Sequence, residues 1–275
     1  MADNYSVLMS VYYKENPDYL RQSMNSMLRQ TVLTDDFVLV CDGPLTPELD
    51  SIIDEMRGCF GPALNVLRLP VNGGLGNALN QGIKLCKNEI VARMDSDDIA
   101  FPGRCEKQIR YLKEKNADFL SAGVLEFNEN VSDAKIMRVP PETNGEIIRF
   151  AKKRNPINHP CSMYKKSAVE AVGGYQDFYL LEDYYLWIRM LLKGFTAYNI
   201  QEPLLYMRAG SDMYRRRSGG KYARSQRKLF KFMRENGFIS EADYLSSCCI
   251  RTLSAMAPNW LRKFMFKTIL RKQNI

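Results

Sequence analysis

The stretch EIVARMDSDD, residues 89–98, is an apolar run that ends in Asp95, Asp97 and Asp98. The apolar part predicts a buried β-strand. Carboxylates crowded at a strand end repel one another unless a cation or a donor-rich ligand compensates. Hard cations such as Mg²⁺ and Mn²⁺ take oxygen ligands, and ligands of open α/β sheets bind at the carboxyl ends of strands. The stretch therefore predicts a metal–nucleotide site; a solvated acidic loop that caps the next helix is the alternative.

Strands and helices alternate on both sides of this stretch. Such alternation indicates right-handed βαβ units and a mostly parallel central sheet flanked by helices, so the predicted fold class is α/β. The strands are continuous apolar runs, as expected for parallel strands buried on both faces. We predict strands at 6–12, 37–41, 65–69, 89–94 and 118–127, and helices at 16–28, 46–57, 75–85 and 102–114.

The composition is that of a globular chain of one or two domains, with 275 residues of which 45% are hydrophobic. Seven cysteines form no C-x-x-C pair, which favours free buried thiols in a reducing compartment. The N-terminal residues do not resemble a signal peptide, and no apolar run approaches the roughly 18 residues that span a bilayer. We therefore expect a cytoplasmic protein.

Positive charge is concentrated in the last quarter of the chain. Residues 205–275 contain 16 Lys and Arg side chains against 4 Asp and Glu, a net charge of +12. Residues 1–204 contain 23 against 27, a net charge of −4. This asymmetry predicts an anionic partner for the C-terminal quarter, such as phosphate, nucleic acid or a membrane surface.

Polar residues follow three of the predicted strands: Tyr12 and Tyr13, then Asp42 with Gly43, then the aspartates after residue 94. In a doubly wound sheet these strand ends lie on one edge, where they can hold a base, a ribose and a diphosphate. The stretch NGGLGN, residues 72–77, adds a glycine-rich turn that opens a helix and suits close ligand approach. A plain tight turn is the alternative.

Two further polar sites lie later in the chain. Asp183, in LLEDYYLW, is placed at the N-terminus of a predicted helix among aromatic residues. Its spacing favours helix capping, and a general base in a cleft is the functional interpretation. The single histidine, His159, lies between two prolines in a predicted loop, where a binding role and a structural role are equally well supported.

The chain resembles family 2 of the inverting glycosyltransferases, which have a GT-A fold, from Tyr5 to about Ser211. Five motifs occur in the family's order: SVLMSVY (6–12), CDG (41–43), NGGL (72–75), RMDSDD (93–98) and LED (181–183). The stretches NPINHP (155–160) and RAGSDMYRRR (208–217) are similar to the branch that assembles bacterial exopolysaccharide and O-antigen, of the amylovoran type.

The resemblance implies a role for each matching residue. Asp97 would ligate Mn²⁺ or Mg²⁺, and Asp183 would be the base that deprotonates the acceptor hydroxyl. Asp42 would bond the uracil ring, Tyr12 would pack near the base, and Asp95 would contact ribose or metal. The donor-binding residues implied are Tyr12, Asp42, Asn72, Gly74 and Asp95. The residues implied in acceptor or phosphate contacts are Glu182, His159, Arg208, Arg215 and Arg216.

The chain departs from the family's pattern in three places. Leu79 stands before Asn80 where many members carry an arginine, so an arginine contact to the donor is not implied there. No histidine follows Tyr206, which removes a histidine ligand from the expected metal site. The Q-x-x-R-W motif of processive synthases is absent, which favours addition of one sugar per encounter.

The basic C-terminal quarter contains two candidate binding segments. The run RRRSGGK, residues 215–221, suits bidentate binding of phosphate, with a solvated face as the alternative. Residues 258–272 are amphipathic, with Trp260 and Phe264 beside lysines and arginines. This pattern suits an anionic bilayer surface, with a helix docked on the protein's own core as the alternative.

We therefore expect residues 1–210 to form a GT-A domain, with a nucleotide-binding half (1–127) and an acceptor half (128–210). Residues 211–275 are expected to form a basic, mostly helical extension. The expected activity is inverting transfer of one sugar from a UDP-sugar, with galactose slightly favoured. The acceptor would be a saccharide, lipid-diphosphate-linked, used in bacterial surface polysaccharide synthesis on the inner face of the plasma membrane.

Two other functions fit parts of the sequence. A sugar-phosphate nucleotidyltransferase also combines a glycine-rich turn with metal-binding carboxylates, but residues 12–15 lack the glycine-rich loop expected after its first strand. A basic nucleic-acid-binding module fits the C-terminal arginines. No nucleic-acid-binding motif accompanies them, and an acidic sheet edge repels phosphate when no metal is bound. We expect no nucleic acid partner.

Overall fold

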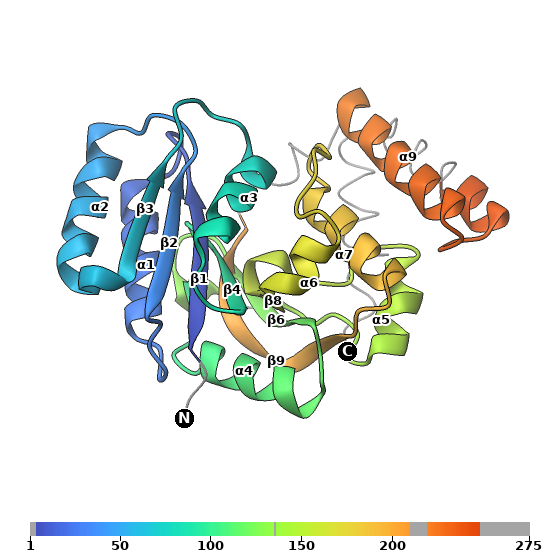
Figure 1. Cartoon of the computed structure of the whole chain (residues 1–275), viewed down its shortest axis with the longest axis horizontal. Coiled ribbons are helices and arrows are strands. Elements are labelled where there is room, and N and C mark those ends of the chain that lie inside the picture. Colours follow the sequence, from blue (N-terminus) through green and yellow to red (C-terminus); the bar gives the residue numbers. More distant parts are fainter. Residues whose placement is uncertain (1–3, 135, 210–218, 248–275) are drawn as a thin grey trace.

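A computed structural model describes residues 4–134, 136–209 and 219–247 of the chain. In this part of the chain the strands form one sheet of nine strands, with the order β3-β2-β1-β4-β8-β6-β9-β5 and with β7 paired to β6 (Figure 1). The strands are β1 Tyr5–Val11, β2 Asp36–Cys41, β3 Leu64–Arg68, β4 Ile90–Asp95, β5 Ile99–Ala100, β6 Phe119–Phe127, β7 Ile136–Arg138, β8 Met163–Lys165 and β9 Ala197–Arg208.

The first half of the sheet follows the sequence pattern. β1 pairs in parallel with β2 and β4, and β2 pairs in parallel with β3. Every residue of β2 is buried, as its continuous apolar run predicts. The predicted parallel sheet is thus confirmed for the four strands β3-β2-β1-β4.

The second half of the sheet is mixed. β8 lies antiparallel between β4 and β6, and β5 and β7 also pair antiparallel with their neighbours. The long strands β6 and β9 pair in parallel. The central sheet is thus mixed but mostly parallel, as expected in the coarser sense. The antiparallel pairings of this half were not predicted, because strands of two or three residues such as β5, β7 and β8 are too short to leave a periodic pattern.

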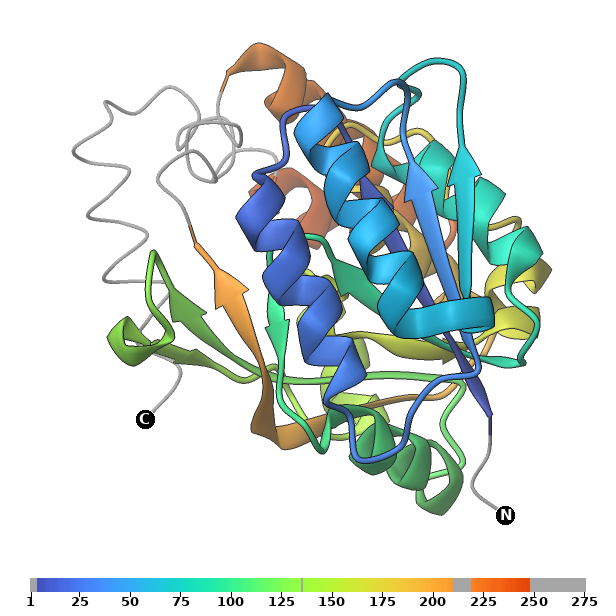
Figure 2. The same ribbon diagram turned by 90° about the vertical axis from the view of Figure 1, so that its left-hand side faces the viewer.

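Helices cover both faces of the sheet (Figures 1 and 2). One hydrophobic cluster holds the buried residues of α1, α2 and α4, and α1 lies beside α2. The other holds those of α3, α5, α6, α7 and α9. The helices are α1 Pro17–Leu28, α2 Pro47–Phe60, α3 Leu75–Leu85, α4 Arg104–Glu114, α5 Asn144–Ala151, α6 Lys166–Ala171, α7 Glu182–Leu192 and α9 Gly220–Glu235.

The starts of the first two helices follow from their capping residues. The side chain of Asn16 accepts the N–H of Asp18, and Pro17 occupies the first helical position of α1. In α2 the side chain of Thr46 accepts the N–H of Leu49, and Pro47 occupies the first helical position. These local signals explain why both helices begin where the sequence predicts.

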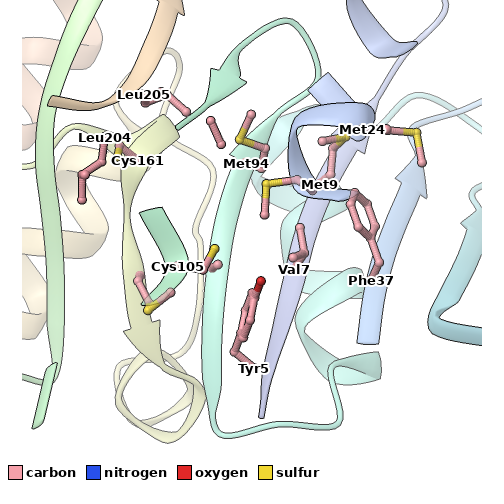
Figure 3. Packing of buried hydrophobic residues seen from close by; sticks show 14 of the residues in the cluster. Tyr5, Val7, Met9, Met24, Phe37, Met94, Cys105, Cys161, Leu204 and Leu205 are labelled. Atoms are coloured by element: carbon pink, nitrogen blue, oxygen red, sulfur yellow. The ribbon is translucent and has the colours of Figure 1, made fainter. Parts of the chain in front are cut away.

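The core between α1, α4 and the sheet is built from apolar and sulfur-containing side chains. Figure 3 shows Val7 and Met9 of β1 with Met94 of β4, and Cys105 near Tyr5. Four of the five described cysteines are buried free thiols, as predicted, and only Cys59 is exposed. Burial raises the pKa of the Cys41 thiol to about 11, so this thiol stays protonated.

The described part of the C-terminal quarter is α9 and the segment that follows it. Leu229, Phe230 and Met233 of α9 are buried in the same cluster as Trp187 of α7. The segment 215–218 and the amphipathic segment 258–272 lie outside the described residues. None of the described helices is both long enough and apolar enough to cross a bilayer.

Candidate active site

The carboxyl ends of the first strands lie side by side, as predicted. Val11 is in register with Cys41, and the N–H of Asp42 donates to the carbonyl of Val11 at 2.8 Å. On the other side of β1, Ser10 is in register with Asp95. Parallel pairing therefore brings Tyr12, Asp42 and Asp95 to one edge of the sheet.

Three carboxylates gather at this edge, in what we call the aspartate cluster: Asp95, Asp97 and Asp98. One oxygen from each lies within 4.8 Å of the others. Asp98 is 1% exposed, and its Oδ1 accepts the N–H of Arg208 at 2.7 Å. Its Oδ2 is buried and has no hydrogen-bond partner. Such an orphaned oxygen is costly unless a ligand completes it.

Burial and like charges raise the pKa values of two carboxyl groups in the cluster. Burial, followed by the charges of Asp95 and Glu15, raises the pKa of Asp97 to about 7. Burial, followed by the charges of Asp97 and Asp95, raises the pKa of Asp98 well above its usual range. These side chains are therefore poorly solvated, and their ionised forms need a positive partner.

A divalent cation fits this donor set. The ligands are all hard carboxylate oxygens, as Mn²⁺ and Mg²⁺ prefer, and one buried oxygen lacks a partner. Asp97, with Asp95 and Asp98, would hold the ion. When bound, the ion would supply positive charge against a diphosphate leaving group.

Asp42 organises the glycine-rich loop. Its Oδ1 accepts the N–H of Gly73 at 2.8 Å, and its Oδ2 accepts the N–H of Gly74 at 2.9 Å. The Asn72 amide donates to the Asp42 carbonyl at 3.0 Å. Gly43 has φ +87° and a Cβ there would lie 2.7 Å from the Asn72 nitrogen, so only glycine fits. These bonds hold the loop of residues 72–74, which we call the cradle, in a fixed conformation beside the strand ends.

Tyr12 and Tyr13 leave aromatic surface exposed at the same edge. Their side chains are 37% and 49% exposed, and the two rings meet edge to face with centroids 5.8 Å apart. An exposed aromatic ring can stack against a flat partner. Tyr12 is therefore available to a flat ligand such as a nucleotide base.

Asp183 lies in the first turn of α7. Leu181 occupies the cap position, so Asp183 is the second helical residue. Its Oδ1 accepts the N–H of Tyr184 at 2.7 Å, which serves the helix start, and its Oδ2 accepts the Asn155 amide at 2.6 Å. The carboxylate is thus oriented from two sides.

The start of α7 contacts the start of α3. A Cβ at Gly76 would lie 3.7 Å from the Cβ of Glu182 and 3.6 Å from that of Tyr175. Asn80 fastens the same contact, because its Oδ1 accepts the Tyr175 N–H at 2.7 Å. The structure therefore brings Glu182 and the glycine-rich loop to the same region.

The other predicted site residues are engaged within the protein. His159 is 7% exposed, and its Nε2 lies 2.9 Å from the Tyr175 hydroxyl. Burial, with the nearby charge of Arg93, holds the pKa of His159 well below its usual range, so the ring is neutral. Arg215 and Arg216 lie outside the described residues.

Arg208 stabilises the turn that carries the aspartate cluster. Its Nε donates to the Asp97 carbonyl at 3.0 Å, and one of its Nη groups donates to the Asn128 carbonyl at 3.0 Å. The guanidinium also lies 3.6 Å from the centroid of the Tyr19 ring. Arg208 therefore contributes positive charge beside the cluster from a fixed position.

Two residues of the site had no predicted role. Asn155 orients Asp183, and the only sequence signal was its place in the NPINHP stretch. Arg93 forms a salt bridge with Asp95 from inside β4. The signal for Arg93 was a charged residue within an otherwise apolar strand.

Comparisons with known proteins agree with this architecture. A model of the family "Glycosyl transferase family 2" matches residues 6–173. The fold is similar to that of S. aureus TarS 1-349 in complex with UDP-GlcNAc, with a TM-score of 0.68 and 18% identity, covering 96% of this chain and 73% of that one. It is also similar to the mannosyltransferase PcManGT from Pyrobaculum calidifontis in complex with GDP-Man and Mn²⁺ (TM-score 0.64, 14% identity, covering 98% and 81%).

Relatives of higher identity extend over nearly the whole chain. The amylovoran biosynthesis glycosyltransferase AmsE of Erwinia amylovora is 37% identical, over 96% of this chain and 98% of AmsE. A UDP-Gal:alpha-D-GlcNAc-diphosphoundecaprenol beta-1,3-galactosyltransferase of Escherichia coli is 37% identical, over 98% of this chain and 97% of that enzyme. The chain belongs to glycosyl transferase family 2, and it is an inverting hexosyltransferase with the predicted GT-A fold.

Proposed function

We propose that this family 2 glycosyltransferase transfers a single sugar from a UDP-sugar, with galactose favoured, to a lipid-diphosphate-linked saccharide in bacterial surface polysaccharide synthesis. The observation that carries the proposal is the meeting of three features at one sheet edge. These are the aspartate cluster, the cradle held by Asp42, and the acidic start of α7 beside that cradle. The first two suit a nucleoside diphosphate, and the third suits a hydroxyl nucleophile.

Each residue has a chemical task in this proposal. Tyr12 covers the uracil ring, Asp42 bonds it, and the cradle of Asn72 and Gly74 receives the donor. Asp95 contacts the ribose or the metal that Asp97 ligates. A Mn²⁺ or Mg²⁺ ion held there would supply positive charge against the diphosphate leaving group. PcManGT, similar in fold, carries Mn²⁺ with its donor.

The transfer itself rests on Asp183. Its carboxylate takes the proton of the acceptor hydroxyl while that oxygen attacks the anomeric carbon. The bond from the anomeric carbon to the UDP oxygen breaks on the opposite face, so the configuration inverts. Asn155 keeps the carboxylate directed during this step, because its amide donates to Oδ2. Glu182 lies next to this base and is proposed to contact the acceptor.

The preference for galactose and for a lipid-diphosphate acceptor is supported by the relatives. The E. coli relative is by its description a galactosyltransferase that acts on an undecaprenol-diphosphate-linked sugar. It aligns with this chain over nearly its full length. An acceptor of that kind would hold the enzyme at the inner face of the plasma membrane.

The described part of the basic C-terminal quarter supports a membrane position. α9 carries five exposed basic side chains: Lys221, Arg224, Arg227, Lys228 and Lys231. In Figure 1, β1 runs upward from the N-terminal end and α9 lies near the top, whereas α4 lies at the bottom. We propose that α9, together with the basic segments around it in the sequence, including Arg215 and Arg216, faces anionic lipid and the acceptor diphosphate.

The donor is tested by UDP release. The purified protein is incubated with Mn²⁺, a panel of UDP-sugars and a lipid-diphosphate-linked N-acetylglucosamine, beside an Asp97→Ala control. We expect UDP release with UDP-galactose that the control and a chelator abolish. Release with a different UDP-sugar would correct the donor. No release with any of them, together with no Mn²⁺-dependent UDP binding, would overturn the proposal.

The membrane position is tested by vesicle flotation. We expect the protein to float with phosphatidylglycerol vesicles and not with phosphatidylcholine vesicles. Arg224→Glu, Arg227→Glu and Lys231→Glu together should weaken flotation. The matched control reverses three exposed charges of α4 and its C-cap, Arg110, Lys113 and Lys115, and should float normally. Equal loss in both variants would show that only net charge matters and would remove α9 from the proposal.

A further inference from the structure

Two fully buried arginines flank β4 on opposite faces. Arg93 belongs to β4 itself and is 1% exposed, and its register partner is Leu8, which lies in the cluster beneath α3 and α7. Arg104 opens α4 on the other face and is 0% exposed. A buried guanidinium is expensive unless every donor finds an acceptor. The two side chains can therefore be compared donor by donor.

Arg104 is completely engaged. Its Nε donates to Gln108 Oε1 at 3.0 Å, and one Nη contacts the Met94 sulfur at 2.9 Å. The other Nη donates to the carbonyl of Arg93 at 2.5 Å and approaches that of Ser162 at 3.4 Å. These bonds join α4 to β4 and to the segment before β8. Arg104 is accounted for by the fold alone.

Arg93 is engaged differently. One Nη forms a salt bridge with Asp95 Oδ1, whereas Nε and the other Nη have no hydrogen-bond partner. Its charge is felt by His159 and Tyr175, which are neutral neighbours and supply no counter-charge. The fold thus carries a buried cation whose one acidic partner belongs to the aspartate cluster.

We propose that Arg93 is a positioning residue of the donor site, which acts through Asp95. The Asp95 side chain is 34% exposed and has two like charges beside it, Asp97 and Asp98. Repulsion would turn a free carboxylate at this position outward, into solvent. The salt bridge from Arg93 holds one oxygen inward and fixes the direction of the other. The inference rests on the proposed function, because it assigns to Asp95 a contact with the donor nucleotide or its metal.

The proposal predicts that Arg93 and Arg104 variants differ both in the stability of the fold and in donor binding. Replacing Arg93 by methionine keeps similar volume and removes two unbonded buried donors, but it also leaves Asp95 without its cation beside Asp97 and Asp98. Because Asp95 is 34% exposed and water can solvate it, the two effects offset and the fold should change little in stability. The same change at Arg104 breaks bonds that connect three segments, so it destabilises. Donor binding should respond in the opposite way, because of these two arginines only Arg93 forms a salt bridge with the aspartate cluster.

The experiment uses the full chain with Arg93→Met, Arg93→Lys, Arg104→Met and Arg104→Lys. The Tm is measured without metal, and UDP affinity is measured by calorimetry with and without Mn²⁺. For Arg93→Met we expect a Tm that changes little and a Kd for UDP with Mn²⁺ raised about tenfold, as for loss of one charge-assisted hydrogen bond. Arg93→Lys should recover part of the affinity.

The Arg104 variants supply the matched control. Arg104→Met should lower the Tm, and its folded fraction should bind UDP as the unchanged protein does. Arg104→Lys serves if the methionine variant does not fold. Wild-type UDP affinity in Arg93→Met would overturn the positioning role. So would a lowered Tm with lost affinity that lysine does not restore, because that marks a structural residue. A wild-type chain that binds no UDP with Mn²⁺ would instead overturn the proposed function, and this role with it.

Discussion

The aspartate cluster and Asp183 are both acidic parts of the proposed active site, and their hydrogen bonding differs. The cluster gathers three carboxylates, buries an oxygen without a partner and raises the pKa of Asp97 and Asp98. Asp183 is a carboxylate that receives a donor on each oxygen, from Asn155 and from the helix start. The first site has more acceptors than donors, and the second has its acceptors matched.

The difference shows how two groups of the same chemistry acquire separate tasks. A surplus of buried negative oxygens makes a place for a cation and for the phosphates that accompany it. A carboxylate with fixed orientation makes a base for one hydroxyl. Donor binding should therefore depend on the cluster, and transfer should depend on both sites.

The strongest test of this division is Asp97→Asn. The change keeps the shape but removes a charge, so Mn²⁺-dependent UDP binding should be lost and transfer should fall on the order of 10³-fold. The metal-free protein should become more stable, because one repelling anion is gone. Calorimetry and thermal unfolding measure both. Asp54→Asn on α2, an exposed aspartate beside Arg57, is the control. Normal UDP binding by Asp97→Asn would refute the role of the cluster.

Asp183→Asn should separate the two sites. We expect kcat to fall by about 10²–10⁴-fold, the usual contribution of a general base, with UDP affinity unchanged. The asparagine retains an oxygen for the Tyr184 N–H, so the helix start is preserved. Single-turnover transfer and UDP titration give the two quantities. Equal loss of both would mean that Asp183 belongs to the donor site, and the division would fail.

Asn155→Ala tests how far orientation matters at Asp183. The variant removes the amide that lies 2.6 Å from Oδ2, and we expect kcat to fall about tenfold, the value of one hydrogen bond to a charged group. UDP affinity and Tm should change little. Asn130→Ala, in an exposed loop, is the control. An unchanged kcat would show that the helix start alone orients the base.

The pH dependence of stability tests the buried pair of His159 and Tyr175, which lies between the two acidic sites. The Tyr175 hydroxyl, which pairs with His159, feels the charges of Arg93 and of Asp183. The pKa of His159 is depressed in the folded protein, so the unfolded chain takes the proton first, and stability is lost as pH falls below about 6.5. The slope contributed is at most about 1.4 kcal/mol per pH unit.

Urea unfolding at several pH values measures this contribution. His159 is the single histidine of the chain, so the difference between wild type and His159→Asn isolates its titration from that of the carboxylates. The variant should lose the slope between pH 5 and 6.5, a window set by the ordinary pKa of histidine at about 6.5. Parallel stability curves would mean that His159 binds its proton equally well in the folded and unfolded chain, contrary to its burial.

The sequence predicted those parts of the fold that depend on local pattern. Apolar runs and caps such as Asn16-Pro17 mark the first four strands and their helices. Parallel register then brings Asp42 and Asp95 together, which made the sheet edge predictable. The short strands β5, β7 and β8 were not predicted, because two or three residues carry no period. The partners of β5 and β8 are also distant in sequence.

The site was predictable to the same extent. Polar residues at strand ends can be recognised in the sequence, because they directly follow an apolar run. Asn155 and Asp183 are hydrogen-bonded although 28 positions separate them, and no local pattern connects them. Arg93 was hidden inside an apolar run, and His159 looked like a loop residue because prolines flank it. In the structure that turn, His159–Cys161, packs beneath Tyr175 and is buried. Tertiary packing, not local chemistry, decides such positions.

The hydrogen bond from the Arg208 backbone to Asp98 has a consequence for the order in which the protein is made. It joins residues 110 positions apart, and β9, which ends at Arg208, pairs along its length with β6. A ribosome that has released the chain only through β5 has made all three aspartates, yet the turn that holds them still lacks its hydrogen bond to Arg208. Contacts of such long sequence separation form late in folding. The nascent chain therefore completes its nucleotide site only after β9 has docked on β6.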